Sequence, residues 1–179
     1  MTATIALLRS INVGGRKVVM AELRALAVEL GFADARTLLA SGNLVFTVGG
    51  RSAAEIEALL EDAVATRLGV RTDVMARTAQ DWRAVIAGNP FPEEAERDPA
   101  HLVVVALKAA PTPAAIESLR GAISGREVVR VQGREAYIIY PDGIGESRLT
   151  NVVIDRKLDV PGTGRNWNTV LKLAELAGA

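Results

Sequence analysis

The 179-residue sequence has no cysteine and a single histidine, His101. The absence of cysteine excludes disulfides, thiol catalysis and thiolate metal sites. A histidine-based metal site or a Ser–His–Asp triad would depend on one imidazole, and no Asp, Glu and His cluster has the spacing of metal ligands. We therefore predict no metal and no cofactor. His101 opens a predicted strand close to Asp98, and a structural role at the strand end is favoured over catalysis.

The sequence also lacks an excess of charge and is poor in aromatic residues. It has 21 basic and 21 acidic side chains, and aromatic residues make up 4%. Nucleic-acid binders usually carry a basic excess or stripe, so the zero net charge does not favour a nucleic-acid partner, although a local basic patch is compatible with it. The scarcity of aromatic residues argues against a sheet that stacks RNA bases.

Long apolar runs are absent too. No run approaches the roughly 20 residues that a membrane span needs, and the first eight residues are too short and lack the basic flank of a signal peptide. We expect a cytoplasmic protein with no membrane partner. The sequence does not indicate an oligomeric state.

What the sequence has is enough apolar material for a core, 49% of its residues, arranged with alternating periodicities. The Gly42-Asn43 pair is typical of a tight hairpin, and Ser52 with Glu55 forms a capping box for a helix. The resulting order βαββαβ is the ferredoxin-like arrangement. Its predicted elements are a strand at 4–8, a helix at 20–30, strands at 36–41 and 44–48, a helix at 52–68 and a strand at 70–76.

The second half repeats this plan with one change. A helix stands where the fourth strand is expected, so the order is βαββαα, and the charged run 93–98 is predicted to be a surface connection. We therefore predict an α+β fold with a ferredoxin-like subdomain at 1–77 and a second, related subdomain at 78–179. The predicted elements of the second subdomain are a strand at 101–108, a helix from about 113, strands at 127–131 and 135–140, a helix from 147 or 150 and a last helix at 166–177.

Six stretches of the sequence form a recognisable pattern. They are Leu-Arg-Ser-Ile-Asn-Val-Gly-Gly at 8–15, Met-Ala-Glu-Leu-Arg at 20–24, Ser-Gly-Asn-Leu-Val-Phe at 41–46, Asn-Pro-Phe at 89–91, Tyr-Pro-Asp-Gly-Ile-Gly at 140–145 and Thr-Gly-Arg-Asn-Trp-Asn-Thr-Val at 163–170. Together they resemble the domain of unknown function 1697 family. One departure is Ser10, where the family usually has glycine. The resemblance implies a ferredoxin-like first subdomain and a related second one, and it implies no activity, because the family has no established function.

The predicted topology brings three polar loops to one edge of the first sheet. In a ferredoxin-like sheet, the end of strand one, the hairpin between strands two and three and the start of strand four share that edge, and such loops often carry function. Consecutive N–H groups at Gly14-Gly15, beside basic side chains, would bind an anion. The alternative is that the glycines only permit a turn, and that Gly42-Asn43 is only a hairpin. The residues expected at this edge are Arg9, Ser10, Asn12, Ser41, Asn43, Arg71 and Thr72, and Arg9, Arg16 and Lys17 would add positive charge beside the glycines. The list of predicted ligand-binding residues in this region is Arg9, Ser10, Asn12, Gly14, Gly15, Lys17 and Asn43.

A second candidate segment opens the last predicted helix. Arg165 and Trp167 would offer bidentate contact and stacking to an anion at the helix N-terminus, together with Asn166 and Asn168. The alternative is that an asparagine caps the helix while Trp167 anchors it to the core.

Three functions remain open at this point. The leading hypothesis is a binding module for an anionic ligand, such as a nucleotide, a phosphorylated metabolite or a nucleic-acid end. The second is a metal-independent enzyme acting on a phosphorylated or nucleotide substrate, for which the sequence identifies no proton-transfer group. The third is a protein-interaction scaffold, which predicts a broad exposed apolar patch.

Overall fold

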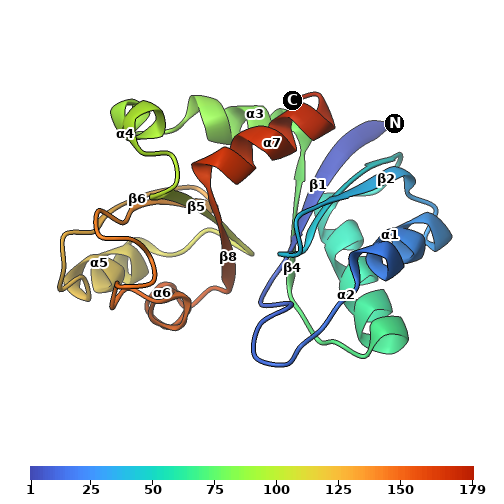
Figure 1. Cartoon of the computed structure of the whole chain (residues 1–179), viewed down its shortest axis with the longest axis horizontal. Helices are drawn as coiled ribbons and strands as arrows, with labels where there is room; N and C mark the ends of the chain where they lie inside the picture. Colours follow the sequence, from blue (N-terminus) through green and yellow to red (C-terminus); the bar gives the residue numbers. More distant parts are fainter. The chain divides into compact units, whose positions relative to one another are not determined.

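The computed structural model describes residues 1–179. The chain divides into two compact units, Met1–Ala84 with Lys172–Ala179, and Val85–Leu171. Each unit holds a four-stranded antiparallel sheet with helices, which confirms the α+β class (Figure 1). The division at residues 77 and 78 stays a prediction; in the structure the segment 172–179 belongs with the first unit.

In the first unit the sheet has the strand order β2-β3-β1-β4, and every neighbouring pair is antiparallel. Helices α1 and α2 cover one face of this sheet (Figure 1). The elements are β1 (Thr2–Leu8), α1 (Met20–Glu29), β2 (Ala33–Leu38), β3 (Asn43–Val48), α2 (Ala53–Leu68), β4 (Val74–Thr78) and α3 (Ala79–Ala87), which continues into the second unit.

Local sequence signals fix the ends of α2. The Ser52 hydroxyl accepts a hydrogen bond from the Glu55 amide at 3.3 Å, and the Glu55 carboxylate accepts one from the Ser52 amide at 2.7 Å. This is the predicted capping box, and it holds the pKa of Glu55 below its usual range. The helix ends at Gly69, whose φ of +70° suits a residue without a Cβ.

Acidic side chains accept the outward-facing N–H groups of β4, the edge strand of the first sheet. β4 lies at the edge beyond β1, and the N–H groups of its alternate residues face away from β1. Each of these groups donates to an acidic side chain, so the edge has no free donors at these positions with which to pair another strand. The hydrogen bonds run from Val74 N to Glu61 Oε1 (2.8 Å), from Ala76 N to Glu57 Oε1 (2.8 Å) and from Thr78 N to Asp81 Oδ2 (2.9 Å).

The second unit has the equivalent strand order, β6-β7-β5-β8. Its core gathers the buried side chains of β5 and β7 beneath α5 and α6. The elements are α4 (Pro92–Arg97), β5 (Leu102–Leu107), α5 (Pro113–Gly121), β6 (Val128–Gln132), β7 (Glu135–Ile139), α6 (Asn151–Leu158), β8 (Gly162–Asn166) and α7 (Trp167–Ala177).

The prediction of βαββαα for the second half is wrong, because a fourth strand, β8, precedes the last helix and pairs with β5. The strand is hard to predict from the sequence because two of its five residues are glycine, which is disfavoured in strands. A Cβ on Gly162 would lie 2.7 Å from Val105 and 2.8 Å from Leu107, and one on Gly164 would lie 3.0 Å from Val103. The side chains of β5 occupy that space, so β8 needs glycine at positions 162 and 164, although glycine is disfavoured within strands.

Two further features of the fold differ from, or add to, the expectations. The charged run 93–98 is not a plain connection, because Pro92 starts a short helix, α4, that includes most of it. No helix in the protein is both long enough and apolar enough to cross a membrane.

The end of the chain belongs to the first unit. Helix α7 begins in the second unit, and from Lys172 onward its residues are part of the first. Within the first unit, the Arg83 guanidinium donates to the carbonyl oxygen of Gly178 at 3.3 Å.

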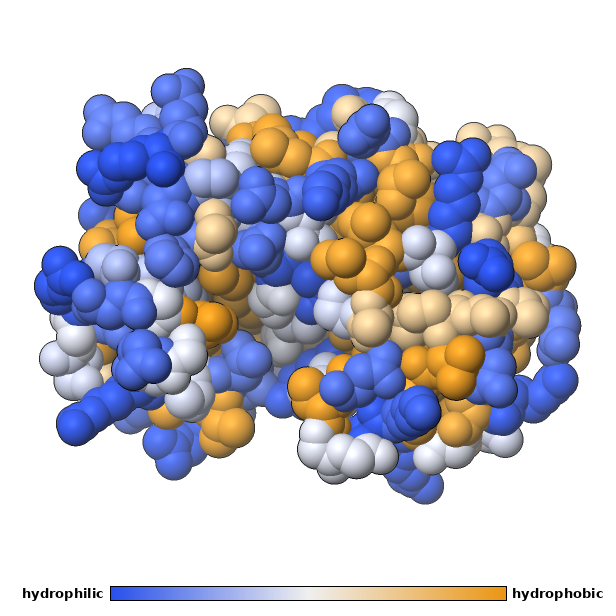
Figure 2. Space-filling view, viewed as in Figure 1, coloured by the Kyte–Doolittle hydropathy of each residue, from blue (hydrophilic) through white to orange (hydrophobic).

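On the face seen in Figure 2, hydrophobic residues lie in groups among hydrophilic ones. The most exposed large apolar side chains come from separate segments: Met1 at the start of the chain, Val152 in α6, Val28 in α1, Val13 in the loop after β1 and Leu39 after β2. The interaction-scaffold hypothesis stays a prediction from the sequence.

Candidate functional site

The loop after β1 turns back on itself at the two glycines. Gly14 and Gly15 have φ values of +58° and +87°, and Arg16 N donates to the Val13 carbonyl at 3.2 Å. Two successive left-handed residues make the tight turn for which glycine is preferred. Both glycines are exposed, with nothing within 4 Å of an added Cβ. The glycines are therefore needed for the turn, as the alternative interpretation expected, and the turn presents Arg16 and Lys17 to solvent.

Asn12 fastens this turn to the neighbouring hairpin. Its amide nitrogen donates to the carbonyl of Val18 at 3.1 Å and to that of Ala40 at 2.6 Å, while its amide oxygen accepts from Val18 N at 2.9 Å. The side chain is therefore occupied within the protein. Asn12 and Ser10 also have left-handed φ values, +55° and +51°. The strain at Ser10 explains why glycine suits this position in the family pattern.

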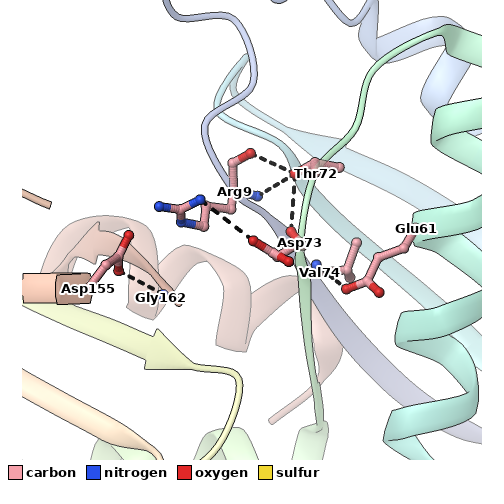
Figure 3. A network of polar contacts seen from close by, with 7 residues as sticks. All are labelled: Arg9, Glu61, Thr72, Asp73, Val74, Asp155 and Gly162. Atoms are coloured by element: carbon pink, nitrogen blue, oxygen red, sulfur yellow. Dashed lines mark hydrogen bonds and ion pairs between the residues drawn. The ribbon is translucent and has the colours of Figure 1, made fainter. Parts of the chain in front are cut away.

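Arg9 joins the end of β1 to the segment before β4. Its guanidinium lies 3.5 Å from the Asp73 carboxylate, and its backbone N–H donates to the Asp73 carbonyl at 3.0 Å. The Thr72 hydroxyl donates to the Arg9 carbonyl at 2.6 Å and accepts from Arg9 N at 3.0 Å (Figure 3). Part of the charge of Arg9 is thus offset by Asp73, and this network fixes the start of β4.

The hairpin between β2 and β3 packs against the loop after β1. Asn43 is fully buried, and its amide donates to the Leu38 carbonyl at 2.7 Å and to the Ser41 hydroxyl at 3.0 Å. A buried side chain with these partners stabilises the hairpin and offers little to a ligand. Gly42 has φ +80°, and an added Cβ would lie 2.7 Å from Ile11. Ile11 of the loop therefore rests against a position that only glycine leaves open.

A basic hollow lies beside this turn. Its volume is about 400 Å³, and it is lined by Gly15, Arg16, Lys17, Gly69, Val70 and Arg71. Three of the six lining residues are cationic and none is acidic. The side chains of Arg16, Lys17 and Arg71 are exposed and engage no carboxylate in the structure. The hollow therefore carries a concentrated positive charge in a protein whose net charge is zero.

The sequence-based candidates divide into three groups around this hollow. Gly15 and Lys17 line it, and Gly14 shapes the same turn. The chain also brings Arg9 and Asn12 close to this turn, but their side chains are held by partners within the protein, and Asn43 lies buried in the hairpin. Ser10 is half-buried in the loop. Thus Gly15 and Lys17 line the hollow, whereas the side chains of Arg9, Asn12 and Asn43 make contacts within the protein.

The ligand-site list from the sequence missed Arg16, Gly69, Val70 and Arg71. The first basic side chain follows the two glycines directly, and topology already placed Arg71 at this edge. No motif marks the segment 69–71, however, because its role depends on Gly69 ending α2 with a left-handed φ. Only the folded chain brings that turn to the glycine loop.

The second candidate segment, 163–169, is mostly buried. Arg165 lies in β8 opposite Val104 with 8% of its surface exposed, and its guanidinium donates to the Thr163 hydroxyl and the Gly164 carbonyl, both at 2.8 Å. Burial lowers the pKa of Arg165 to about 10. Its side chain is therefore a structural donor in the sheet.

The helix that follows Arg165 has a cap and an anchor. The Asn166 amide oxygen accepts from Thr169 N at 3.0 Å, Trp167 is 5% exposed, and Asn168 is exposed. This geometry matches the cap-and-anchor alternative for Asn166 and Trp167, and it leaves Trp167 no exposed face on which a ligand would stack.

Outside the hollow, several titratable groups lie in pairs. The Asp98 carboxylate lies 2.7 Å from Nδ1 of His101. In the second unit, Arg126 pairs with Asp142 and lowers the pKa of that carboxyl, and the Ser147 hydroxyl donates to Glu127. No group of three or more His, Cys, Asp and Glu residues has an arrangement that holds a metal ion. These pairs indicate structural roles.

Both tyrosines of the chain are buried and hydrogen-bonded. The Tyr137 hydroxyl donates to the Val85 carbonyl at 2.7 Å, and the Tyr140 hydroxyl donates to the Leu149 carbonyl at 3.0 Å. Burial, with a smaller contribution from the charge of Glu135, raises the pKa of Tyr137 to about 12. Burial and then the charge of Glu127 raise the pKa of Tyr140 further. Neither hydroxyl titrates near neutral pH, so neither serves as a general base there.

Fold and site together define an α+β protein of two four-stranded sheets with one strongly basic hollow in its first unit. The model of the DUF1697 family, described as a protein of unknown function, matches residues 1–137. The chain belongs to this family, which confirms the resemblance seen in the sequence.

A solved structure is similar over the whole chain. It is described as a conserved bacterial protein, SP0830 from Streptococcus pneumoniae, and it matches with a TM-score of 0.74 and 23% sequence identity over 98% of each chain. At this identity the likeness supports the fold alone. No curated protein matches the sequence.

Proposed function

We propose that the first unit binds an anionic ligand in the basic hollow between the turn at 13–17 and the segment at 69–71. The observation that carries this proposal is the grouping of Arg16, Lys17 and Arg71 around a space of about 400 Å³ with no acidic residue among the lining. Unpaired cations that face one another repel, so a bound anion relieves this repulsion and gains Coulomb energy.

The backbone at the hollow supports the same function. Gly15 and Gly69 both have positive φ and nothing within 4 Å of an added Cβ, so a ligand approaches the main chain there without meeting a side chain. A volume of about 400 Å³ lies within the range of about 300–1,000 Å³ typical of small-molecule sites. The size and chemistry suit a nucleotide or a phosphorylated metabolite.

The proposal also includes a ferredoxin-like arrangement for the first unit. The order β2-β3-β1-β4 with α1 after β1 and α2 after β3 agrees with it. In that arrangement the loop after β1 and the approach to β4 share one sheet edge, which is where the hollow lies. A cytoplasmic location stays a prediction, as does the enzyme alternative, for which no carboxylate and no histidine lines the hollow.

The test is anion binding by the full chain, measured by calorimetry and by the rise in melting temperature at constant ionic strength. We expect phosphate-bearing compounds to bind and to lose affinity as salt screens the cations. Substitution R71A is expected to weaken binding about 3- to 10-fold, corresponding to a Coulomb contribution of about 1 kcal/mol at a solvated site.

The matched control is R24A, which removes an exposed basic residue of α1 that does not line the hollow. It lowers the net charge by the same amount and should leave the affinity unchanged. Equal losses in R71A and R24A would show that only the overall charge matters, and would refute the proposed site. The absence of binding by any phosphorylated compound would refute anion binding itself.

A further inference from the structure

Given anion binding in the basic hollow, we infer that the ligand is recognised through a chain of at least two phosphate groups and not through a base or a sugar. This inference rests on the proposed function and concerns the class of ligand. It follows from the charge, the lining and the backbone of the hollow.

The charge of the hollow exceeds what a single phosphate balances. Arg16, Lys17 and Arg71 each carry a positive charge, and the lining has no carboxylate. A monophosphate group carries about −1.5 to −2 near neutral pH, which leaves part of the basic charge unbalanced. A diphosphate or triphosphate supplies several negative charges along a line. Its separate phosphates would contact the basic residues of the turn and Arg71 at the same time.

The side chains suit phosphate oxygens. Two of the three cations are arginines, whose planar guanidinium groups form paired hydrogen bonds to phosphate, while the Lys17 ammonium acts as a point charge. Gly15 and Gly69 keep the neighbouring backbone free of Cβ atoms, so a compact, highly charged group is able to reach the main chain. These features suit phosphate groups, and because guanidinium groups also pair with carboxylates, a carboxylate ligand is the necessary control.

Apart from its two arginines, whose guanidinium groups the phosphates engage, the lining has no side chain of the kind that reads a nucleobase. Val70 is its only apolar side chain, and it is itself 9% exposed. The hollow has no aromatic residue on which a base would stack, and it has no asparagine, glutamine, serine or threonine side chain to pair with a base edge. Base recognition commonly depends on such groups. We therefore expect a ligand to be bound by its phosphate chain whatever base it carries.

The experiment compares sodium phosphate, pyrophosphate, triphosphate, ATP, GTP, CTP and citrate by calorimetry, with EDTA present and at constant ionic strength. Citrate controls for charge without phosphate. We expect affinity to rise by about 10-fold or more from phosphate to triphosphate, because each added charge meets a further cation. The three nucleotides should agree with one another and with triphosphate within about 3-fold, since the base adds no contact.

Two variants separate the inference from the proposed function. In R71A, one cation is lost, so the increase in affinity from phosphate to triphosphate should be about 3- to 10-fold smaller than in the wild type. In R24A, the increase in affinity should be the same as in the wild type. Phosphate binding as tightly as triphosphate, citrate matching triphosphate, or a difference above about 10-fold among the nucleotides would overturn this inference while leaving anion binding in place. If none of the compounds binds, the proposed function fails first.

Discussion

Gly42 offers a test of how the loop is built, because Gly50 of the same unit has a similar backbone conformation but lacks the close neighbours of Gly42. Gly42 and Gly50 both have left-handed backbone, with φ of +80° and +70°. An added Cβ at Gly50 meets nothing within 4 Å. At Gly42 it would lie 2.7 Å from Ile11 Cδ1 and 2.9 Å from Leu8 Cβ.

The magnitudes follow from these distances. In G50A, the only penalty is the left-handed conformation, about 1 kcal/mol. In G42A, the same penalty is joined by a clash. Ile11 Cδ1 is the end of a flexible side chain, but Leu8 Cβ is fixed to the backbone of the central strand β1, so relief requires the hairpin or the loop to shift. Overpacking of this kind costs about 1–3 kcal/mol. We expect G42A to lose about 2–4 kcal/mol of unfolding free energy.

The assay is urea unfolding followed by circular dichroism and by tryptophan fluorescence, with the midpoint and slope measured for each variant. The chain has two tryptophans, and Trp82 lies in the first unit, buried to 1%. Because Gly42, Gly50 and Trp82 all lie in the first unit, the transition reported by Trp82 is the relevant one, and a W167F background isolates its signal.

The difference between the two glycine variants is the decisive quantity, since it cancels the shared backbone penalty. Losses that agree within about 0.5 kcal/mol would refute the account of Gly42 as a contact site for the loop. The same clash should displace Ile11 and with it the basic turn, so G42A should also weaken anion binding while G50A does not.

Two further predictions concern buried polar groups. In E57A, the Ala76 N–H loses its acceptor, so we expect the free energy of unfolding in urea to fall by about 1–3 kcal/mol and hydrogen exchange at Ala76 to become faster. The control D62A changes an exposed residue of the same helix and should stay within about 0.5 kcal/mol of wild type. Equal effects of the two substitutions would contradict the role of Glu57 as the acceptor for β4. Because the pKa of Tyr137 is raised to about 12, its contribution to stability is complete below the unfolded pKa of about 10 and is lost as pH rises from there through the folded value. Absorbance at the tyrosinate band should therefore stay flat to about pH 11 in the folded protein and rise near pH 10 in urea. The variants Y137F and Y140F assign the signal to each tyrosine. Tyrosine titration near pH 10 in the folded protein would refute the burial argument.

The sequence predicted the first unit well because its signals are local. The capping box at Ser52 and the hairpin at Gly42 each act within a few residues. Strand β4 was predicted at 70–76 and lies at Val74–Thr78. The shift arises because Thr72 and Asp73 are held by contacts with Arg9, a partner more than sixty positions away, which no local pattern reveals.

The second unit shows what local patterns cannot supply. Strand β8 has two glycines in five residues, and its pairing depends on the side chains of β5. Because the sequence predicts no strand at 162–166 and starts the last helix at 166, it places Arg165 and Trp167 at an exposed helix start and not in the interior. For the candidate site, topology brought Arg71 near the glycine turn, but the absence of a carboxylate partner for the three cations is a property of the folded chain alone.

The return of α7 to the first unit makes the second unit, in effect, an insertion between two parts of one structure. A ribosome must synthesise residues 85–171 before residues 172–179 exist. During translation the first sheet is thus the first to be made, yet its unit is the last to be completed. Any chaperone that meets the emerging chain encounters a first unit still missing its closing helical turns, whereas the second unit already has all of its residues.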